Sequence, residues 1–137
     1  MERGNIKINI EEGKTPVVEA TLTNNGLWLT VNEMARLLGC FVQTVNAHLR
    51  SIFREHLLWE TECSVCHRYI AKGIEKQTVF YNLEVLISVS YRIATFEAGI
   101  FRQFVHSALR ENLKKKKTSG AKIVWKYLPV QSRYWLN

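Results

Sequence analysis

Apolar side chains recur at helical spacing in one stretch in the first half of the chain. Thr30 precedes this stretch and Glu33 follows three residues later, which is the spacing of a capping box. Met34 and Leu38 then continue an apolar stripe, and Gly39 provides the residue that most easily adopts a left-handed conformation at a helix end. We therefore predict a helix that begins after Thr30 and ends at Gly39.

A second helix is predicted just beyond this glycine. Val45 and Leu49 stand four positions apart, on a face that can pack against the first helix. The opposite face carries Gln43, Asn46, Ala47 and Arg50. Two helices with this glycine turn and spacing are typical of a helix-turn-helix that binds DNA, although the pattern also occurs in enzymes and interaction modules.

Alternating apolar and polar residues predict strands on both sides of the two helices. Before them, the alternation covers 6–10, 18–22 and 27–29, and predicts an antiparallel β-meander. After them, 64–71 and 77–81 predict a β-hairpin. Its expected tip is the charged, glycine-containing segment 72–76. A hairpin that follows a DNA-reading helix forms a wing.

Two further helices are predicted toward the C-terminus. Asn82 is placed to cap the first and Thr95 to cap the second. The second has a broad apolar face, which must be covered by the preceding helix or by a second copy of the chain, so a homodimer is one expectation. The expected fold class is α+β: a winged helix-turn-helix over residues 1–113, with an N-terminal β-meander, a β-hairpin wing and two C-terminal helices.

The charge of the chain lies at its C-terminal end. The net charge is +7, yet residues 1–113 hold twelve Lys and Arg against twelve Glu. The whole excess therefore lies in 114–137, which we interpret as a basic C-terminal tail that contains the aromatic residues Trp125, Tyr127, Tyr134 and Trp135. Such a tail adds salt-sensitive phosphate affinity, or simply keeps the chain soluble. Its aromatics would stack on bases, or pack on the body or a partner.

The composition of the chain argues against a membrane protein, a secreted protein and an enzyme. The chain has 137 residues, of which 47% are hydrophobic, and this is enough to form one hydrophobic core. No apolar run approaches the roughly 18 residues of a membrane span, and the first residues lack the apolar core of a secretory signal, so we expect a cytoplasmic protein that binds no membrane. The chain has no Asp, no phosphate-binding glycine loop and no GxSxG motif, so we predict no catalytic residue and no enzyme.

The cysteines supply one candidate metal or haem motif. Cys63, Cys66 and His67 have the CxxCH spacing of covalent haem attachment, but no export signal accompanies it. A zinc site would need a fourth ligand, for which the spacing of Cys40, His48 and His56 gives no specific support. We therefore predict no cofactor and no metal, and interpret Cys66 as a small buried residue.

Several segments resemble a known family. LWLTVNEMARLLG, TVNAHLRSIF and FYNLEVLISVSYRI resemble the bacterial RhuM proteins in the same order, and the likeness covers roughly residues 6–113. The family is described as DNA-binding and virulence-associated, is encoded on mobile elements, and includes members that occur with or fused to Fic/Doc-type proteins. The resemblance implies transcription regulation, with a Fic/Doc-type protein as a possible partner.

The chain also departs from the family pattern. Relatives commonly have a Ser where this chain has Phe41, and Arg where it has Val42 and Ala47. Loss of these cations weakens the electrostatic attraction to DNA. Exposed Phe41 and Val42 would suit a protein contact instead. The alternative hypothesis is therefore a protein-interaction module, antirepressor-like or toxin-associated, that has lost DNA reading.

The first hypothesis remains a sequence-specific regulator that binds double-stranded DNA in its major groove. Amide side chains pair with adenine and Arg with guanine, so four residues are predicted to face the bases: Gln43, Thr44, Asn46 and Arg50. Basic residues elsewhere are predicted to contact phosphates: Arg54, Arg68, Lys72, Lys76, Lys114, Lys115, Lys116 and Lys117.

Overall fold

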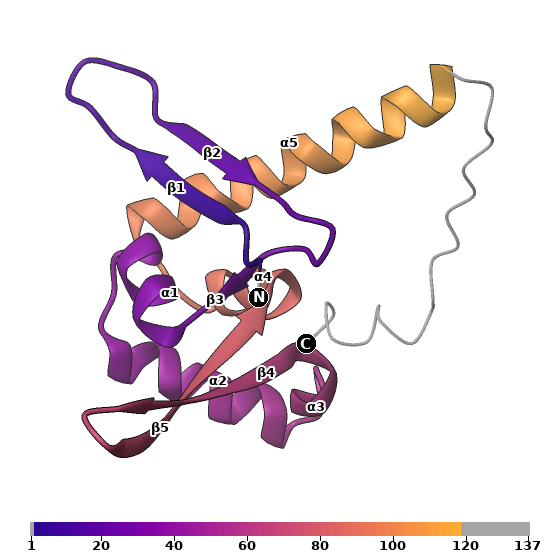
Figure 1. The fold of residues 1–137 in the computed structure, drawn as a ribbon. Helices are drawn as coiled ribbons and strands as arrows, with labels where there is room; N and C mark the ends of the chain where they lie inside the picture. Colours follow the sequence, from indigo (N-terminus) through magenta and orange to yellow (C-terminus); the bar gives the residue numbers. More distant parts are fainter. Residues whose placement is uncertain (1, 119–137) are drawn as a thin grey trace. The chain divides into compact units, whose positions relative to one another are not determined.

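The computed structural model describes residues 2–118, and their helices and antiparallel strands form an α+β fold (Figure 1). Residues up to Val105 belong to one compact unit, and a second unit begins at His106. The elements in chain order are β1 (Asn5–Asn9), β2 (Val17–Thr21), β3 (Trp28–Leu29), α1 (Val31–Leu38), α2 (Val42–Arg54), α3 (Glu60–Cys63), β4 (Ser64–Ala71), β5 (Ile74–Asn82), α4 (Leu83–Ser90) and α5 (Phe96–Thr118).

Local interactions explain where α1 begins and ends. The Glu33 N–H donates to the Thr30 hydroxyl at 3.1 Å, and the Thr30 N–H donates to the Glu33 carboxylate at 2.8 Å. This capping box satisfies two backbone donors that the helix leaves open. Gly39 ends the helix with φ 65° and ψ 40°, a left-handed conformation that glycine adopts without a side-chain clash. Both features were predicted from the sequence and are confirmed.

The core forms where α1 and α2 cross. Met34 and Leu38 of α1, and Val45 and Ile52 of α2, are completely buried, and Ala35 is nearly so. Truncation of a buried Leu or Ile to Ala costs about 2–5 kcal/mol, so these contacts hold the two helices firmly. α4 covers the same core with Val85, Leu86 and Val89.

The strands form two separate antiparallel sheets. One pairs β1 with β2, from Asn5 opposite Thr21 to Asn9 opposite Val17. The other has the order β3-β5-β4.

The predicted N-terminal meander is therefore wrong in its third strand, because Trp28 pairs with Asn82 of β5 and not with β2. Alternation specifies which face of a strand is buried but not its partner, and the pairing with β5 buries Leu27 and Leu29 in the core.

The two C-terminal helices carry the predicted caps. Asn82 accepts a hydrogen bond from the Val85 N–H at 3.2 Å. Thr95 accepts from the Ala98 N–H at 3.1 Å and donates to the Leu38 carbonyl at 2.5 Å, which ties the start of α5 to the end of α1.

The apolar face of α5 is only partly covered within the first unit. Phe101 is fully buried there, whereas Phe96 is 64% exposed. The helix then continues past residue 113, where we predicted the tail to begin, as far as Thr118.

Candidate nucleic-acid interface

The outer face of α2 is polar and exposed. Gln43, Ala47, Arg50 and Arg54 follow one another at spacings of three or four residues, so they lie on one side of the helix. Among the described residues, neither guanidinium has an ion-pair partner. This face therefore presents one amide and two cations to solvent.

Two of the predicted base-facing residues lie at the border of this face. Thr44 and Asn46 are half-buried, whereas Gln43 and Arg50 are exposed. The helix begins at Phe41, whose side chain is 78% exposed and makes no capping hydrogen bond. A large apolar ring thus stands in solvent at the N-terminus of α2.

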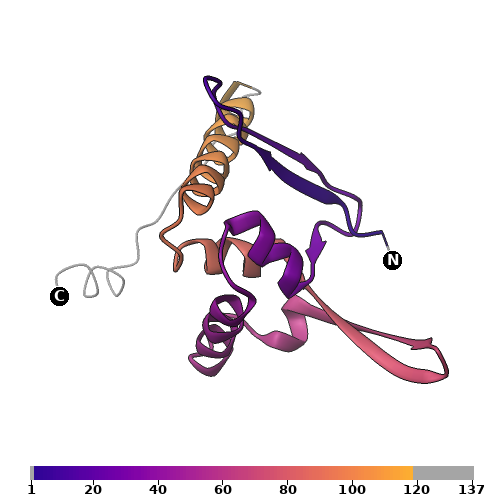
Figure 2. The same ribbon diagram turned by 90° about the vertical axis from the view of Figure 1, so that its left-hand side faces the viewer.

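A tight hairpin, β4–β5, projects from the body of the first unit, and α2 meets it at its base, where Phe53 stacks on Tyr81 (Figures 1 and 2). Its turn consists of Lys72 and Gly73, with φ 53° and 75°, so both central residues are left-handed, as in a type I′ turn. The predicted tip at 72–76 is therefore too long, because β5 already begins at Ile74. Lys76 lies in the ladder opposite Tyr69.

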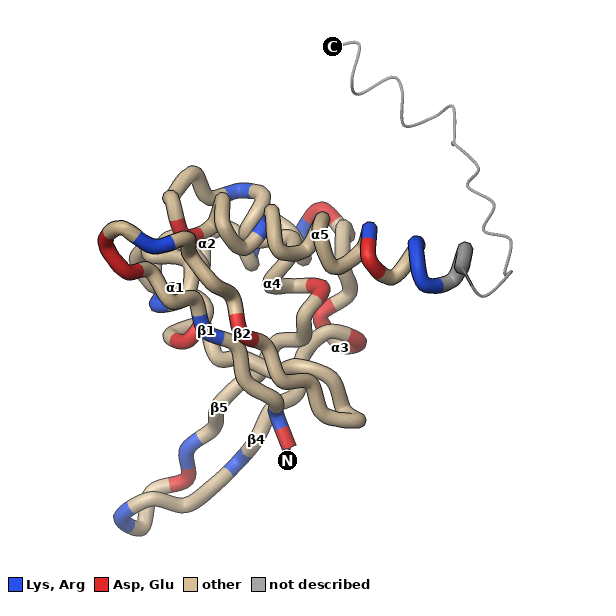
Figure 3. Tube along the Cα trace, turned by 90° about the horizontal axis from the view of Figure 1, so that it is seen from above, with Lys and Arg blue, Asp and Glu red and all other residues tan. Residues whose placement is uncertain are grey.

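The register separates the cations of this hairpin. Directly paired residues share a face, and successive residues alternate between faces. Arg68 lies opposite Gln77, on the face that Tyr81 shares, whereas Lys76 lies on the other face. Lys72 stands at the turn between them, and Figure 3 shows these charged positions toward the hairpin tip. The cations thus surround the tip instead of forming a single row.

A cleft of about 410 Å³ lies between α2 and the sheet. Phe53 and Tyr81 contribute to its wall, with ring centroids 6.1 Å apart. Burial raises the pKa of Tyr81, and the nearby Glu60 carboxylate raises it further. The remaining lining residues are Asn46, Leu49, Arg50, Arg54 and Glu60. Three residues predicted from the sequence to bind DNA therefore meet here, while the two aromatic residues were not predicted.

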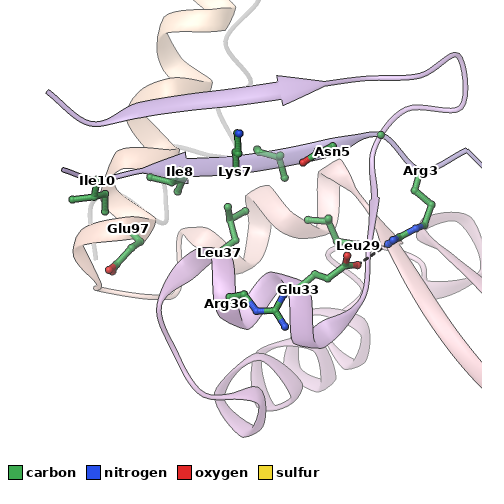
Figure 4. A pocket seen from close by; sticks show the side chains of 12 residues that line it. Arg3, Asn5, Lys7, Ile8, Ile10, Leu29, Glu33, Arg36, Leu37 and Glu97 are labelled. Carbon is green, nitrogen blue, oxygen red and sulfur yellow. Dashed lines mark hydrogen bonds and ion pairs between the residues drawn. The ribbon is translucent and has the colours of Figure 1, made fainter. Parts of the chain in front are cut away.

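A wider cleft of about 730 Å³ lies between β1 and α1 (Figure 4). At one end Arg3 forms an ion pair with Glu33 at 2.7 Å and stacks over the Phe80 ring at 4.9 Å. Partial burial raises the pKa of Glu33, but the hydrogen bonds from Thr30 and the Arg3 guanidinium outweigh it and lower the pKa overall. Apolar residues of β1 and Leu37 line the cleft. The sequence offered no signal for it, because its walls come from segments far apart in the chain.

The two cysteines of the CxxCH motif differ in burial. Cys63 is buried at the end of α3, whereas Cys66 is exposed and donates to Gln77 at 3.4 Å. The interpretation of Cys66 as buried is thus wrong, because the side chain of Cys63 takes the core position. Burial raises the pKa of the Cys63 thiol, with a smaller contribution from Glu84. Within residues 2–118 no three His, Cys or Glu side chains gather as metal ligands.

The predicted lysine cluster belongs to the second unit. Lys114 lies on α5 and pairs with Glu111 at 3.7 Å, one helical turn away. Lys115 is exposed, and Lys116 and Lys117 continue the helix. The four tail aromatics predicted to stack or pack lie outside the described residues.

Comparison with protein-family models, curated proteins and solved structures gave no match to this chain. Within the described residues, no helix has both the length and the apolar character needed to span a bilayer.

Proposed function

We propose that this chain is a sequence-specific regulator that binds double-stranded DNA as a winged helix-turn-helix protein. The observation that carries the proposal is the exposed amide-and-guanidinium face of α2. Phe53 of this helix stacks on Tyr81, at the base of a hairpin whose cations have no ion-pair partner among the described residues. A polar helix face suits the groove of a duplex, and cations on a hairpin joined to the same core suit its phosphates.

The order of elements supports this assignment. A short strand, the helices α1 and α2, the four-residue helix α3 and a hairpin follow one another, and the short strand β3 pairs with the second hairpin strand β5. In this arrangement α2 is the recognition helix and β4–β5 is the wing. The core between α1 and α2 holds the recognition helix rigidly, which base reading requires.

The proposed contacts divide into bases and phosphates. Gln43 and Asn46 would pair with adenine, and Arg50 with guanine, because an amide and a guanidinium each match one of those edges in the major groove. Thr44 would lie at the border of the same contact. The cations proposed to hold phosphates are Arg54, Arg68, Lys72 and Lys76, joined by Lys114, Lys115, Lys116 and Lys117.

Membership of the RhuM family is part of the proposal and rests on the residues quoted above. A Fic/Doc-type partner, a role in virulence and a cytoplasmic location follow from the same resemblance and composition. A homodimer is proposed because part of the apolar face of α5 is uncovered in the first unit, where Phe96 is 64% exposed.

The test is a binding titration with a duplex selected by the full chain from a random-sequence pool. Arg50→Ala should weaken binding by about 1–3 kcal/mol and relax the preference at one base pair, because a bidentate contact is lost. Arg36→Ala is the matched control, since Arg36 is also helical, exposed and without an ion pair among the described residues. Equal affinity of wild type and Arg50→Ala would remove α2 from the interface.

A second candidate function is protein docking through the start of α2. The observation that favours it is Phe41, whose ring is 78% exposed where a capping residue would normally stand. The same titration separates the two functions. A protein-docking module would show weak duplex binding without sequence preference, with the same affinity for both Arg variants.

A further inference from the structure

One edge of β1 borders the larger cleft and has no strand beside it in the described structure. Within residues 2–118, β1 pairs with β2 along its other edge only, and no residue of β2 lines the cleft. The consecutive residues 5–8 of β1 all line it. Because successive side chains of a strand point to opposite faces, a cleft lined by consecutive residues is bordered by the edge of the strand. Backbone N–H and C=O groups of β1 therefore face the cleft (Figure 4).

This edge lacks the features that usually protect a strand edge. Proteins protect such edges with charged side chains, prolines or bulges. β1 contains no proline, and it pairs with β2 residue for residue, without a bulge. The one charged side chain of β1, that of Lys7, forms an ion pair with Glu19 of β2 at 3.3 Å. The free edge of β1 is thus able to accept a further strand.

The wall opposite this edge offers both apolar contact and charge. Leu37 of α1 is half-buried there, and Arg36 beside it is exposed. Glu97 of α5 is half-buried, and its carboxylate lies against Gly39 at the end of α1. Neither Arg36 nor Glu97 has an ion-pair partner among the described residues. A ligand with one negative and one positive group would complement both charges.

We propose that an extended peptide segment of another protein binds in this cleft as an additional strand on β1. Its backbone pairs with the free edge of β1, and an apolar side chain packs between Ile8 and Leu37. An acidic side chain of the peptide pairs with Arg36 and a basic one with Glu97. In strand addition the main chain supplies affinity and the side-chain sites supply specificity. The cleft, at about 730 Å³, is within the size range of ligand-binding sites.

The charges favour this occupant over two others. Residues 119–137 contain three cations and no acidic residue, so this segment of the chain has no side chain that complements Arg36. A second copy paired in register along β1 would place two Lys7 side chains opposite each other, and like charges directly opposite are destabilising. A peptide that carries both signs of charge meets neither objection.

The first experiment identifies a peptide and tests the strand pairing. A displayed library of random octapeptides is selected on the full chain, and enriched sequences should combine an apolar residue with an acidic and a basic one. One enriched peptide is then synthesised with a fluorophore, and its affinity is measured by anisotropy. Methylation of its backbone nitrogens, one at a time, should weaken binding strongly at every second position. Alternate N–H groups of a strand point to the same edge, so only one set of them pairs with β1.

The second experiment exchanges the charges. Arg36→Glu should weaken binding of the peptide by at least about tenfold, because like charges then meet. Replacing the acidic residue of the peptide by Lys should restore binding to this variant. Glu97→Lys should behave in the same way with a peptide whose basic residue is replaced by Glu. Such rescue excludes misfolding as the cause, since an unfolded variant would bind neither peptide.

Two control variants separate this site from other effects. Glu84 is the second residue of α4, as Glu97 is of α5, and Glu84→Lys should leave the affinity for the peptide unchanged. Arg50→Ala, which tests the proposed duplex binding, should also bind the peptide like wild type. The peptide site does not depend on duplex binding, so the two proposals can fail separately.

Four results would overturn the inference. The library would yield no enriched peptide, the enriched peptides would lack an acidic residue, or the effect of methylation would not alternate along the peptide. In the fourth, light scattering would show a dimer of the free chain that the peptide dissociates, which would assign the edge of β1 to a second copy.

Discussion

The two hairpins of the first unit differ in how their charged and apolar side chains are used. In β1–β2, Lys7 pairs with Glu19 at 3.3 Å across the strands, and Lys14 pairs with Glu11 at 2.9 Å in the connecting loop. Its inner residue Ile8 packs against the hydrophobic core. In β4–β5 the cations have no such partners among the described residues, and the isoleucines of the tip stand in solvent.

This difference in charge pairing distinguishes side chains that hold a hairpin on the fold from side chains that can bind a ligand. Paired charges and a covered apolar face are what a hairpin needs to remain folded on the body. Unpaired cations beside exposed apolar residues add nothing to folding, because they are equally well hydrated in the unfolded chain. The cations of the β4–β5 hairpin are therefore available for a ligand, whereas Lys7 and Lys14 of the other hairpin are paired. Three experiments test this contrast.

The largest expected effect is a loss of DNA affinity when the cations of the β4–β5 hairpin are removed. A variant with Arg68→Gln, Lys72→Asn and Lys76→Gln should bind the selected duplex about 100-fold more weakly at physiological salt, from three lost phosphate contacts. The salt slope should fall by about 2.7. Lys7→Gln with Lys14→Gln is the control, and should leave both quantities unchanged. An equal loss in the control would mean that general charge, and not this hairpin, supplies the attraction.

A smaller effect is expected on the free energy of unfolding, and it should differ between a half-buried and an exposed isoleucine. Ile8→Thr should lower the free energy of unfolding by about 1–2 kcal/mol, because a half-buried contact with the core is lost. Ile70→Thr should change it by less than about 0.5 kcal/mol, since that side chain is already exposed. Denaturant titration measures both. Comparable losses would show that the tip packs on something within the free protein.

The smallest expected effect is a pH-dependent change in melting temperature. It concerns the site where Arg3 connects α1 with β5. The pKa of Glu33 in the folded state lies below its ordinary value of 4.5, so its charge stabilises the fold above pH 4.5 and this contribution is lost as pH falls through the lower folded value. Glu33→Gln keeps the capping geometry but not the charge. Wild type should melt at a higher temperature than Glu33→Gln at pH 7, and the difference should shrink on acidification. A constant difference from pH 7 to pH 3 would exclude the charge as its cause.

Sequence reasoning succeeded where the deciding interactions are local. Thr30 with Glu33, Asn82 with Val85, and Gly39 each act over a few residues, so the spacing alone predicts the helix ends. The exposure of Gln43 and Arg50 followed in the same way from helical periodicity. Predictions failed where a segment could pair with more than one distant segment. The third strand of the predicted meander, for example, pairs with β5 and not with β2.

The sequence predicted only some residues of the candidate site, because the others come together through contacts between distant segments. Periodicity identified Asn46 and Arg50 of the α2 cleft, but not that Phe53 would stack on Tyr81 to form its wall. It placed cations in the hairpin, but a two-residue turn in place of the expected five-residue tip changed which of them stand at its end.

Short-range patterns in the sequence specify the helices α1, α2, α4 and α5, the caps of α1, α4 and α5, and the polar face of α2, because hydrogen bonds and periodicity within a few residues are enough. They did not predict the four-residue helix α3. Long-range packing determines that β3 pairs with β5, that Cys63 and not Cys66 is buried, and that Ile70 and Ile74 are left uncovered. Those outcomes depend on which distant segments compete for the same core, and no local pattern contains that information.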